Sequence, residues 1–468
     1  MGKRVFVEEA FGLARLAVLE DDRLVEIKMQ EGAPGEGLGG IYLGRVQNVL
    51  KGINAAFVDI GLEKSAYLYA KEAALSEGEA SLPITKLLRP GDYTLVQVQK
   101  EAYGQKGARL TRQIALAGHL MVLEPFSGRI GASKRIKDEN RRAALRRRAA
   151  ELVPEGIGLI VRTEAENADD ESFAAELRHL LAVWEGILEG EKTKRQRLLY
   201  DGDSLLRRAL RDHFGEETEC FTVAGEGLFV EARRIAGEFA RALPERLKKH
   251  ESAVPLFDFY GIEKKIDEAL RKRVNLPGGG EIVIEETEAL TVIDVNSARF
   301  MGQSGLEDTA LRTNLDAARE IARQLRLRDI GGAVVIDFID MAVIENRTRL
   351  LDALREALKG DKTPSFVEGL TKLGLVEMTR RRGGARLSSH MEETCPICGG
   401  SGHKMREEQL ARRALREFVL KSCGGAFEIA ARPRLAEQIN RLKGEMDCGV
   451  RVEAGLDAPY RVLAKAEE

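Results

Sequence analysis

The chain has 468 residues, of which 44% are hydrophobic, 32% charged and 5% aromatic, and its formal net charge is −2. This length allows several domains, while no apolar run approaches the roughly 18 residues of a membrane-spanning helix. A near-neutral total neither supports nor excludes nucleic acid as a partner, because local patches decide that question. The first residues lack the apolar core of a signal peptide and the five cysteines are an odd number. We therefore expect a cytoplasmic protein with no transmembrane segment.

The first third of the chain predicts two β-rich units. Residues 1–30 contain two apolar strand patterns with Asp21-Asp22 between them, which indicates a small antiparallel unit. The glycine-rich stretch 32–40 follows as a loop. From residue 41 to about 116, short strands separated by glycines predict a small β-barrel.

Aromatic and basic residues alternate along that predicted barrel. Phe57, Tyr67 and Tyr69 are interspersed with cations such as Lys106. Aromatic rings beside Lys and Arg on such a barrel are typical of a stacking platform for single-stranded nucleic acid. The equally good alternative places Phe57 in the core and the tyrosines on an ordinary surface.

An α/β insert is expected after the barrel. Residues 134–148 (KRIKDENRRAALRRR) hold eight basic residues and two acids, and a helix here is better explained as a solvated face than as a binding site. Arg162 and Thr163 end the strand pattern GLIVRT, where Arg can clamp a phosphate and Thr can add a donor. An Arg-Thr pair alone is nevertheless common, and we assign residues 191–272 a structural role.

The stretch 290–341 carries the strongest signal. Two runs rich in β-branched residues, 290–293 and 333–336, each lead into an acid, and a helical pattern that ends at Gly331-Gly332 separates them. Strand, helix and strand at this length predict a βαβ unit with parallel neighbouring strands. The acids Asp294 and Asp337 should then meet at the carboxyl ends of the strands, where open α/β sheets place ligands.

Two carboxylates in that position favour Mg²⁺, which prefers hard oxygen ligands. Asn296 follows Asp294 by two residues, so it shares its side of an extended chain and can orient a water molecule. The pattern thus indicates a Mg²⁺-dependent phosphodiester cleavage site. The competing interpretation is that both acids only cap loops or helices.

Cys395 and Cys398 form half of a zinc site in CPICGGSG. Tetrahedral Zn²⁺ requires four N or S ligands, and the chain has no second Cys-x-x-Cys. Either His390 and His403 complete a site within one chain, or two chains each contribute both cysteines. A zinc-dependent hydrolase centred on these cysteines is a further, weaker possibility.

The chain resembles the ribonuclease E/G family of endoribonucleases. The matching segments are AAFVDIG, GQKGARLT, VRTE, LTVIDVNSARF, TNLDAAREIARQLRLRDIGGAVVIDFIDM, LGLVEMTR and CPICGGSG, in the family's order over most of residues 40–402. The block 313–341 is highly specific. The part after residue 402 is small and is followed by no long tail, which resembles the shorter members of the family.

The resemblance implies a multidomain α/β and α+β fold with a split first domain. Residues 1–38 and 203–272 would form an RNase H-like domain, and residues 39–116 an OB-type RNA-binding barrel. Residues 117–202 would be a 5′-sensor region, 273–391 a DNase I-like catalytic domain, 392–402 a zinc-link, and 403–468 a small C-terminal domain.

The resemblance also implies roles for single residues. Asp294 and Asp337 would bind Mg²⁺, and Asn296 would support the attacking water. Single-stranded RNA would contact Phe57, Tyr67 and Lys106, and its 5′-monophosphate would contact Arg162 and Thr163. Cys395 and Cys398 would share one structural Zn²⁺ with a second protomer in a homodimer or homotetramer.

We therefore predict a Mg²⁺-dependent endoribonuclease that acts in rRNA processing and mRNA decay. Attack by water would leave 5′-phosphate and 3′-hydroxyl ends, and substrates with a 5′-monophosphate would be favoured. The alternative is a non-catalytic RNA-binding or RNA-chaperone protein, against which the intact set of Asp294, Asn296 and Asp337 argues.

Overall fold

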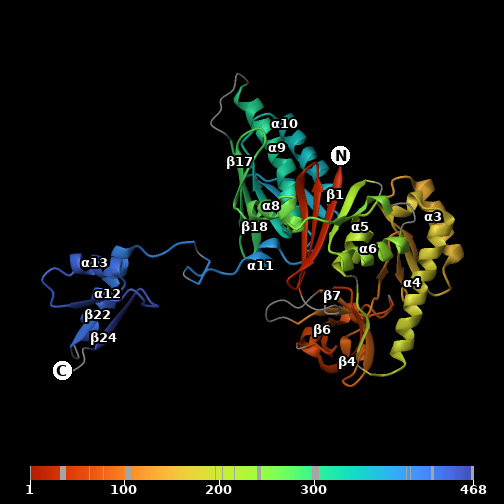
Figure 1. Cartoon of the computed structure of the whole chain (residues 1–468), viewed down its shortest axis with the longest axis horizontal. Coiled ribbons are helices and arrows are strands. Elements are labelled where there is room, and N and C mark those ends of the chain that lie inside the picture. The colour runs from red at the N-terminus through yellow and green to blue at the C-terminus, as the bar shows by residue number, and fades with distance from the viewer. Residues whose placement is uncertain are drawn as a thin grey trace. The chain divides into compact units, whose positions relative to one another are not determined.

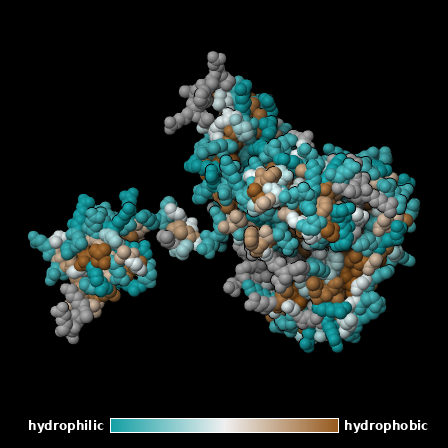
Figure 2. All heavy atoms as spheres, viewed as in Figure 1, coloured by the Kyte–Doolittle hydropathy of each residue, from teal (hydrophilic) through white to brown (hydrophobic). Residues whose placement is uncertain are grey.

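The structure is a computed structural model, and it divides the chain into two compact units, Met1–Met391 and Glu392–Glu468. It describes residues 2–31, 38–62, 64–76, 78–100, 107–195, 197–202, 204–215, 217–239, 244–297, 305–396, 398–400, 402–422 and 426–464. Within these ranges, no helix is long and apolar enough to cross a membrane. Figure 2 shows hydrophilic side chains over most of the visible face of each unit, as the high charged content leads one to expect.

The first sheet joins two stretches that lie far apart in sequence. Its strand order is β15 (Leu247–His250), β14 (Thr218–Ala224), β1 (Lys3–Ala10), β2 (Leu13–Glu20) and β3 (Arg23–Glu31). β1 to β3 form the predicted antiparallel unit, in which Asp21 and Asp22 turn the chain with positive φ. β1 also pairs in parallel with β14, so residues 218–224 complete the sheet.

Helices cover both faces of this sheet. On one face, α5 (Leu205–His213) and α6 (Glu226–Phe239) pack over a buried apolar cluster that includes Val5, Leu206 and Ile235. Figure 1 shows β1 in red beside these two helices. Phe6 on the other face packs with residues of α7 (Leu256–Phe259) and α8 (Ile262–Ala269), and the short helix η3 (Pro244–Arg246) precedes β15.

A closed five-stranded β-barrel follows, as the sequence predicted. Its strands are β4 (Ile41–Leu50), β5 (Ala55–Asp59), β6 (Ala66–Tyr69), β8 (Arg109–Thr111) and β7 (Tyr93–Lys100), and β7 pairs back to β4. Short helices interrupt it: η1 (Lys51–Ile53), α1 (Ala70–Ala73) and α2 (Ile84–Leu87). β13 (Arg197–Tyr200) adds to the outside of β4. Small and branched residues such as Ala56, Val58 and Leu68 fill the interior.

The next part is a small sheet with two helices. The sheet runs β11 (Ile130–Ala132), β12 (Gly158–Val161), β10 (Met121–Glu124) and β9 (Leu116–Ala117). The helices are α3 (Glu139–Leu152) and α4 (Asp170–Glu191), which begin after the N-cap acids Asp138 and Asp169. The η2 turn (Thr163–Asn167) joins β12 to α4.

A six-stranded mixed sheet forms the last part of the larger unit. Its order is β16 (Arg273–Asn275), β17 (Glu281–Glu286), β18 (Leu290–Asn296), β19 (Gly332–Asp337), β21 (Val376–Arg380) and β20 (Ser365–Leu370). The helices α9 (Leu306–Leu327) and α10 (Ile344–Leu358) share its core, and α11 (Leu387–Met391) ends the unit. β18 and β19 are parallel, which confirms the predicted βαβ unit.

The end of α9 differs from the prediction. The helix ends at Leu327, four residues before Gly331, and Asp329 takes the left-handed conformation with φ 51°. Asp can adopt this conformation because its short side chain bonds locally. The glycines instead serve the start of β19, where Gly332 has φ 106°.

The smaller unit is an α/β domain. It contains α12 (Glu407–Ser422), β22 (Phe427–Ala431), α13 (Pro433–Leu442), β23 (Gly449–Val452) and β24 (Tyr460–Ala464). β22 is central, parallel to β23 and antiparallel to β24. Both helices pack on the sheet through a small apolar core that includes Phe418, Ile429 and Leu435.

Candidate active site

The structure brings Asp294 and Asp337 together. They are direct register partners in the parallel pair of β18 and β19, and both are exposed. β18 continues to Asn296, so Asp294 lies inside the strand rather than after it. The amide Nδ2 of Asn296 donates a hydrogen bond of 2.7 Å to Asp294 Oδ2. The three side chains predicted to form the site therefore lie on one surface.

The alternation of the two strands explains this surface. In β18, Thr291, Ile293 and Val295 are buried, which leaves Asp294 and Asn296 facing the solvent. In β19, Val334 and Ile336 are buried and Asp337 is exposed. Because the helices bury the opposite face of the sheet, polar residues can occupy this face without loss of core contacts.

No cation of the described residues neutralises the acid pair. Among the residues that the structure describes, no Lys or Arg forms an ion pair with Asp294 or Asp337. Two like charges opposite each other repel. No group of three or more His, Cys, Asp or Glu gathers here or elsewhere in the described ranges. Two carboxylates nonetheless fit Mg²⁺, which usually takes one or two of them and completes its shell with waters and phosphate.

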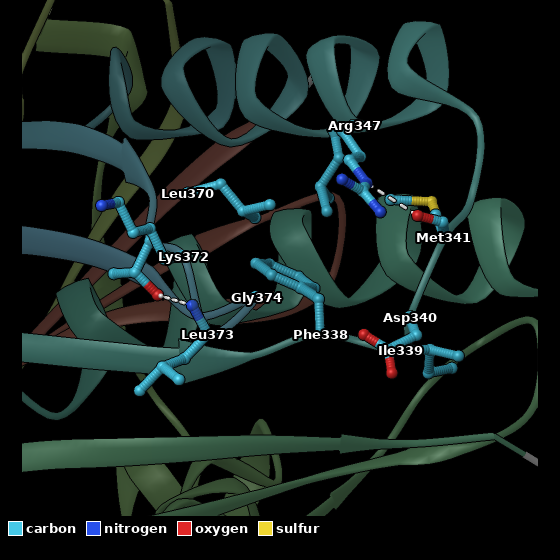
Figure 3. A pocket seen from close by; sticks show the side chains of 11 residues that line it. Phe338, Ile339, Asp340, Met341, Arg347, Leu370, Lys372, Leu373 and Gly374 are labelled. Atoms are coloured by element: carbon cyan, nitrogen blue, oxygen red, sulfur yellow. Dashed lines mark hydrogen bonds between the residues drawn. The ribbon is translucent and has the colours of Figure 1, made fainter.

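A cavity of about 260 Å³ lies directly after Asp337 in the chain but does not include it. Figure 3 shows the Phe338 ring inside this pocket, with Arg347 from α10 and Leu373 from the β20–β21 turn around it. Arg347 Nε donates to the Met341 carbonyl at 2.7 Å, and this bond holds the Arg347 side chain in the lining of the cavity. The exposed acids therefore lie on an open sheet surface rather than in an enclosed pocket.

Aromatic residues gather on the outer surface of the barrel. Phe57 and Tyr67 are cross-strand partners, and both are half-buried. Tyr67 contacts Tyr69 edge to face with ring centroids 5.4 Å apart, and the Arg109 guanidinium lies 5.3 Å from the Tyr69 ring. Neither the Phe57 ring nor the Tyr67 ring belongs to the buried core of the barrel. Lys106, predicted to join them, lies outside the described residues.

Arg162 and Thr163 follow β12 as expected, and the Arg162 guanidinium is held by the protein itself. Its Nη1 donates to the Gly118 carbonyl and its Nη2 to Asp212 Oδ1, both at 2.7 Å. Thr163 Oγ1 lies 3.5 Å from Ser133 Oγ. A planar guanidinium fixed in this way is suited to bind an oxyanion with its remaining donors.

Glu176 on α4 buttresses the same loop. Its Oε1 accepts from the backbone N–H groups of Leu120 and Met121, at 2.9 and 3.3 Å, whereas its buried Oε2 has no hydrogen-bond partner among the described residues. Burial raises the pKa of Glu176 to about 7, against these hydrogen bonds, which lower it. A Cβ at Gly118 would lie 2.0 Å from Oε1, so this close approach requires glycine.

Cys395 and Cys398 lie in the smaller unit, the first exposed and the second half-buried. The Gly399 N–H bonds to the Cys395 carbonyl at 2.8 Å and closes the turn. Backbone N–H groups of Gly402 and Gly400 lower the pKa of the Cys398 thiol. A thiolate is the form that binds zinc.

Comparison with known proteins identifies the chain's relatives. The model of the Ribonuclease E/G family matches residues 115–383. Ribonuclease G of Haemophilus influenzae is 37% identical over 467 residues, which cover 97% of this chain and 94% of that protein. The chain belongs to the ribonuclease E/G family. It is an endoribonuclease homologous to ribonucleases E and G, as the resemblance predicted.

Further relatives show where the chain lies within the ribonuclease E/G family. Ribonuclease G of Escherichia coli strain K12 is 36% identical over 92% of this chain and 90% of that protein. Ribonuclease E of Nostoc is 40% identical over 87% of this chain but only 59% of that protein. The matches to ribonuclease G thus extend over nearly the whole length of both chains, whereas the match to ribonuclease E leaves much of that protein uncovered.

Sequence reasoning missed several residues around these sites. Asp212 was assigned a structural role, yet it binds Arg162. Lys362, in the loop after α10, donates to the Asp212 carbonyl at 2.5 Å. Arg109 joins the aromatic surface of the barrel. No local pattern marks these residues, because their partners lie far away in sequence.

Proposed function

We propose that this enzyme cleaves single-stranded RNA by attack of water at phosphorus, with Mg²⁺ held by Asp294 and Asp337. The register pairing of these two exposed acids, together with the bond from Asn296, is the observation that supports it. Bound Mg²⁺ would neutralise charge on the phosphate as a Lewis acid. Water rather than the ribose 2′-hydroxyl attacks, the bond from phosphorus to the 3′-oxygen breaks, and the 3′-oxygen leaves with a proton, so the products carry 5′-phosphate and 3′-hydroxyl ends.

Asn296 has a defined part in this proposal. Its Nδ2 is used by Asp294, so the amide plane is fixed and Oδ1 is the atom that can accept a hydrogen bond from the attacking water. The exposed position of all three side chains leaves room for an extended RNA strand over the sheet.

The barrel and the Arg162 loop support recognition of the substrate. We propose that Phe57, Tyr67 and Lys106 contact the bases and backbone of single-stranded RNA, since aromatic rings beside cations favour stacking. We also propose that Arg162 and Thr163 receive the 5′-monophosphate. Natural substrates would be rRNA precursors and mRNA in the cytoplasm, where the thiols of Cys220 and Cys448 stay reduced.

The domain names follow from this assignment as proposals. The split sheet of β1 to β3 with β14 and β15 would be the RNase H-like domain, residues 1–38 with 203–272. Residues 273–391 would be the DNase I-like catalytic domain, after the OB-type barrel 39–116 and the 5′-sensor region 117–202. Residues 392–402 would be the zinc-link and 403–468 the small C-terminal domain.

One experiment tests the chemistry and the 5′-end preference together. A short single-stranded RNA is prepared with a 5′-monophosphate or a 5′-hydroxyl and incubated with Mg²⁺ or EDTA. We expect cleavage only with Mg²⁺, faster on the monophosphate, with 3′-hydroxyl products by mass spectrometry. Products with 2′,3′-cyclic phosphates would refute attack by water. If freshly purified enzyme binds the RNA but does not cleave it in Mg²⁺, the non-catalytic RNA-binding alternative would be favoured.

The zinc proposal concerns assembly. Cys395 and Cys398 would share one Zn²⁺ with the same pair of a second protomer, because no third His, Cys, Asp or Glu joins them among the described residues. Cys395→Ser is expected to shift the enzyme from dimer or tetramer to monomer in sedimentation, whereas Cys220→Ser on β14 is not. An unchanged assembly of both variants would contradict the shared site. Loss of cleavage from an intact dimer on zinc chelation would instead favour a zinc hydrolase.

A further inference from the structure

The end of α5 contacts four other segments of the larger unit. We call Arg211, Asp212 and His213 the α5 junction. Its contacts are His119 Nδ1 with the Arg211 carbonyl at 2.9 Å, Arg162 with the Asp212 carboxylate, Lys362 with the Asp212 carbonyl, and Glu26 with His213 Nε2 at 3.5 Å. The partners belong to the β9–β10 loop, the end of β12, the loop after α10, and β3.

The Asp212 carboxylate lies between two guanidinium groups. Arg162 Nη2 is 2.7 Å from Oδ1, and Arg211 donates to both oxygens, at 3.1 Å from Nε and 2.9 Å from Nη2. Burial tends to raise the pKa of Asp212, but the two arginines hold it well below its usual range. Asp212 is therefore ionised at any pH near neutrality and clamps Arg162 as a charge-assisted hydrogen-bond partner.

This arrangement fixes which edge of Arg162 is presented. Its Nη1 is bound to the Gly118 carbonyl and its Nη2 to Asp212, so both ends of the fork are anchored. Nε lies 3.8 Å from Glu164 Oε2, which is beyond hydrogen-bond distance. Nε and the second hydrogens of Nη1 and Nη2 are thus the donors that can still reach an incoming anion. The guanidinium is planar, and holding it in place presents these donors in one fixed direction.

The groups around Arg162 carry both signs of charge. Arg162, Arg211 and Lys362 lie among the carboxylates of Asp212, Glu164 and Glu26. A second contact secures the Lys362 loop, because Arg135 Nη2 donates to the Lys362 carbonyl at 3.0 Å.

We infer that Asp212 is a positioning residue that holds Arg162 in the orientation needed to recognise a 5′-phosphate, and so sets the preference for phosphorylated RNA ends. The inference rests on the proposed preference for 5′-monophosphate. Asp212 itself does not touch the RNA in this arrangement; it acts through Arg162.

The test compares two substrates on the full-length enzyme. Asp212→Asn keeps the shape of the side chain but places an amide NH₂ against arginine donors, so Arg162 loses its fixed orientation. We expect the ratio of kcat/KM for 5′-monophosphorylated over 5′-hydroxyl RNA to fall by about tenfold. Cleavage of the 5′-hydroxyl RNA should stay at the wild-type rate. Binding of both RNAs in EDTA should show the same selective loss for the phosphorylated one.

Asp170→Asn is the matched control. Arg148 and Asp170 form another pair at 2.7 Å next to the same loop, but Asp170 is almost fully exposed and its partner is not at the strand end. This variant should keep the wild-type ratio. Asp212→Glu keeps the charge with a longer arm, so it should fold and lose only part of the preference, which keeps the test decisive if Asp212→Asn unfolds.

The outcomes separate the two proposals. If the wild type cleaves both RNAs equally, the 5′-monophosphate preference is wrong, whatever the variants do. If the wild type discriminates and Asp212→Asn and Asp212→Glu keep its ratio, the role of Asp212 is wrong. A fall of equal size for both RNAs would show that Asp212 is only structural, and would overturn the inference as well.

Discussion

Two pairs of acids lie at opposite ends of β19, and they differ in their burial and in the cations around them. At the carboxyl end, Asp294 and Asp337 are exposed register partners without a cation among the described residues. At the other end, Asp329 and Asp361 are buried and both bind Arg380, at 3.0 and 2.7 Å. Burial tends to raise the pKa of Asp329, but Lys28 and Arg380 lower it below its usual value.

The difference follows from where each pair lies. A buried carboxylate must be paired within the protein, because an unpaired charge in the interior is very unfavourable. Asp329 and Asp361 meet that requirement and secure the base of the sheet. Asp294 and Asp337 are exposed, so they need no partner within the protein, and solvent and ions can reach them. Their charge is thus available to a partner from outside, which is the property that a metal site needs.

The largest expected effect is on activity, from breaking the exposed pair. Asp294→Asn should lower kcat by about 10³-fold or more, because half of the proposed Mg²⁺ ligands and the acceptor for Asn296 are changed. Asp352→Asn, an exposed acid on α10 of the same segment, should cleave normally. Single-turnover cleavage of one defined RNA measures both. Wild-type cleavage by Asp294→Asn would remove the catalytic assignment.

Breaking the buried pair should instead change stability. Arg380→Leu leaves Asp329 and Asp361 buried without their shared cation and is expected to lower the free energy of unfolding by about 3–5 kcal/mol. Arg319→Leu removes a surface partner of Asp316 and should change it by about 0–1 kcal/mol. Urea denaturation followed by circular dichroism compares them. Equal effects of the two variants would mean that burial does not distinguish the pairs.

The same contrast explains what sequence alone could predict. The βαβ unit and the meeting of Asp294 with Asp337 were predictable, because alternation and strand ends are local patterns. The five-stranded barrel was predictable for the same reason. The Asp329–Arg380–Asp361 bridge was not, since three distant loops and strands create it. Asp212 was missed likewise, because a helix-ending acid beside an arginine looks like any surface pair until the fold places Arg162 against it.

A third prediction concerns Glu176, the buried acid on α4, which forms no ion pair with any described residue. The Glu176 pKa is about 7 in the folded enzyme and 4.5 is its ordinary value, so the unfolded chain loses this proton first as pH rises. Stability from Glu176 is therefore fully present below about pH 4.5 and lost up to about pH 7, by on the order of 3 kcal/mol. Glu176→Gln should remove this loss and be more stable than the wild type at pH 8.

The measurement is the difference in unfolding free energy between wild type and Glu176→Gln at pH 5 and pH 8. It should grow with pH, while the exposed Glu185→Gln on the same helix should show no such trend. A difference that does not depend on pH would mean that Glu176 titrates normally and that its orphan oxygen has a partner in solution.

The smallest expected effect returns to the exposed acids. In EDTA, Asp337→Asn removes one of two like charges that face each other and should stabilise the fold by about 0.2–1 kcal/mol. The wild type should gain stability when Mg²⁺ is added, because a ligand that binds only the folded state shifts unfolding. Asp337→Asn should gain much less. If removal of Asp337 destabilises the enzyme in EDTA, or if both proteins respond equally to Mg²⁺, then the exposed acids are structural after all and the contrast between the two ends of β19 does not hold.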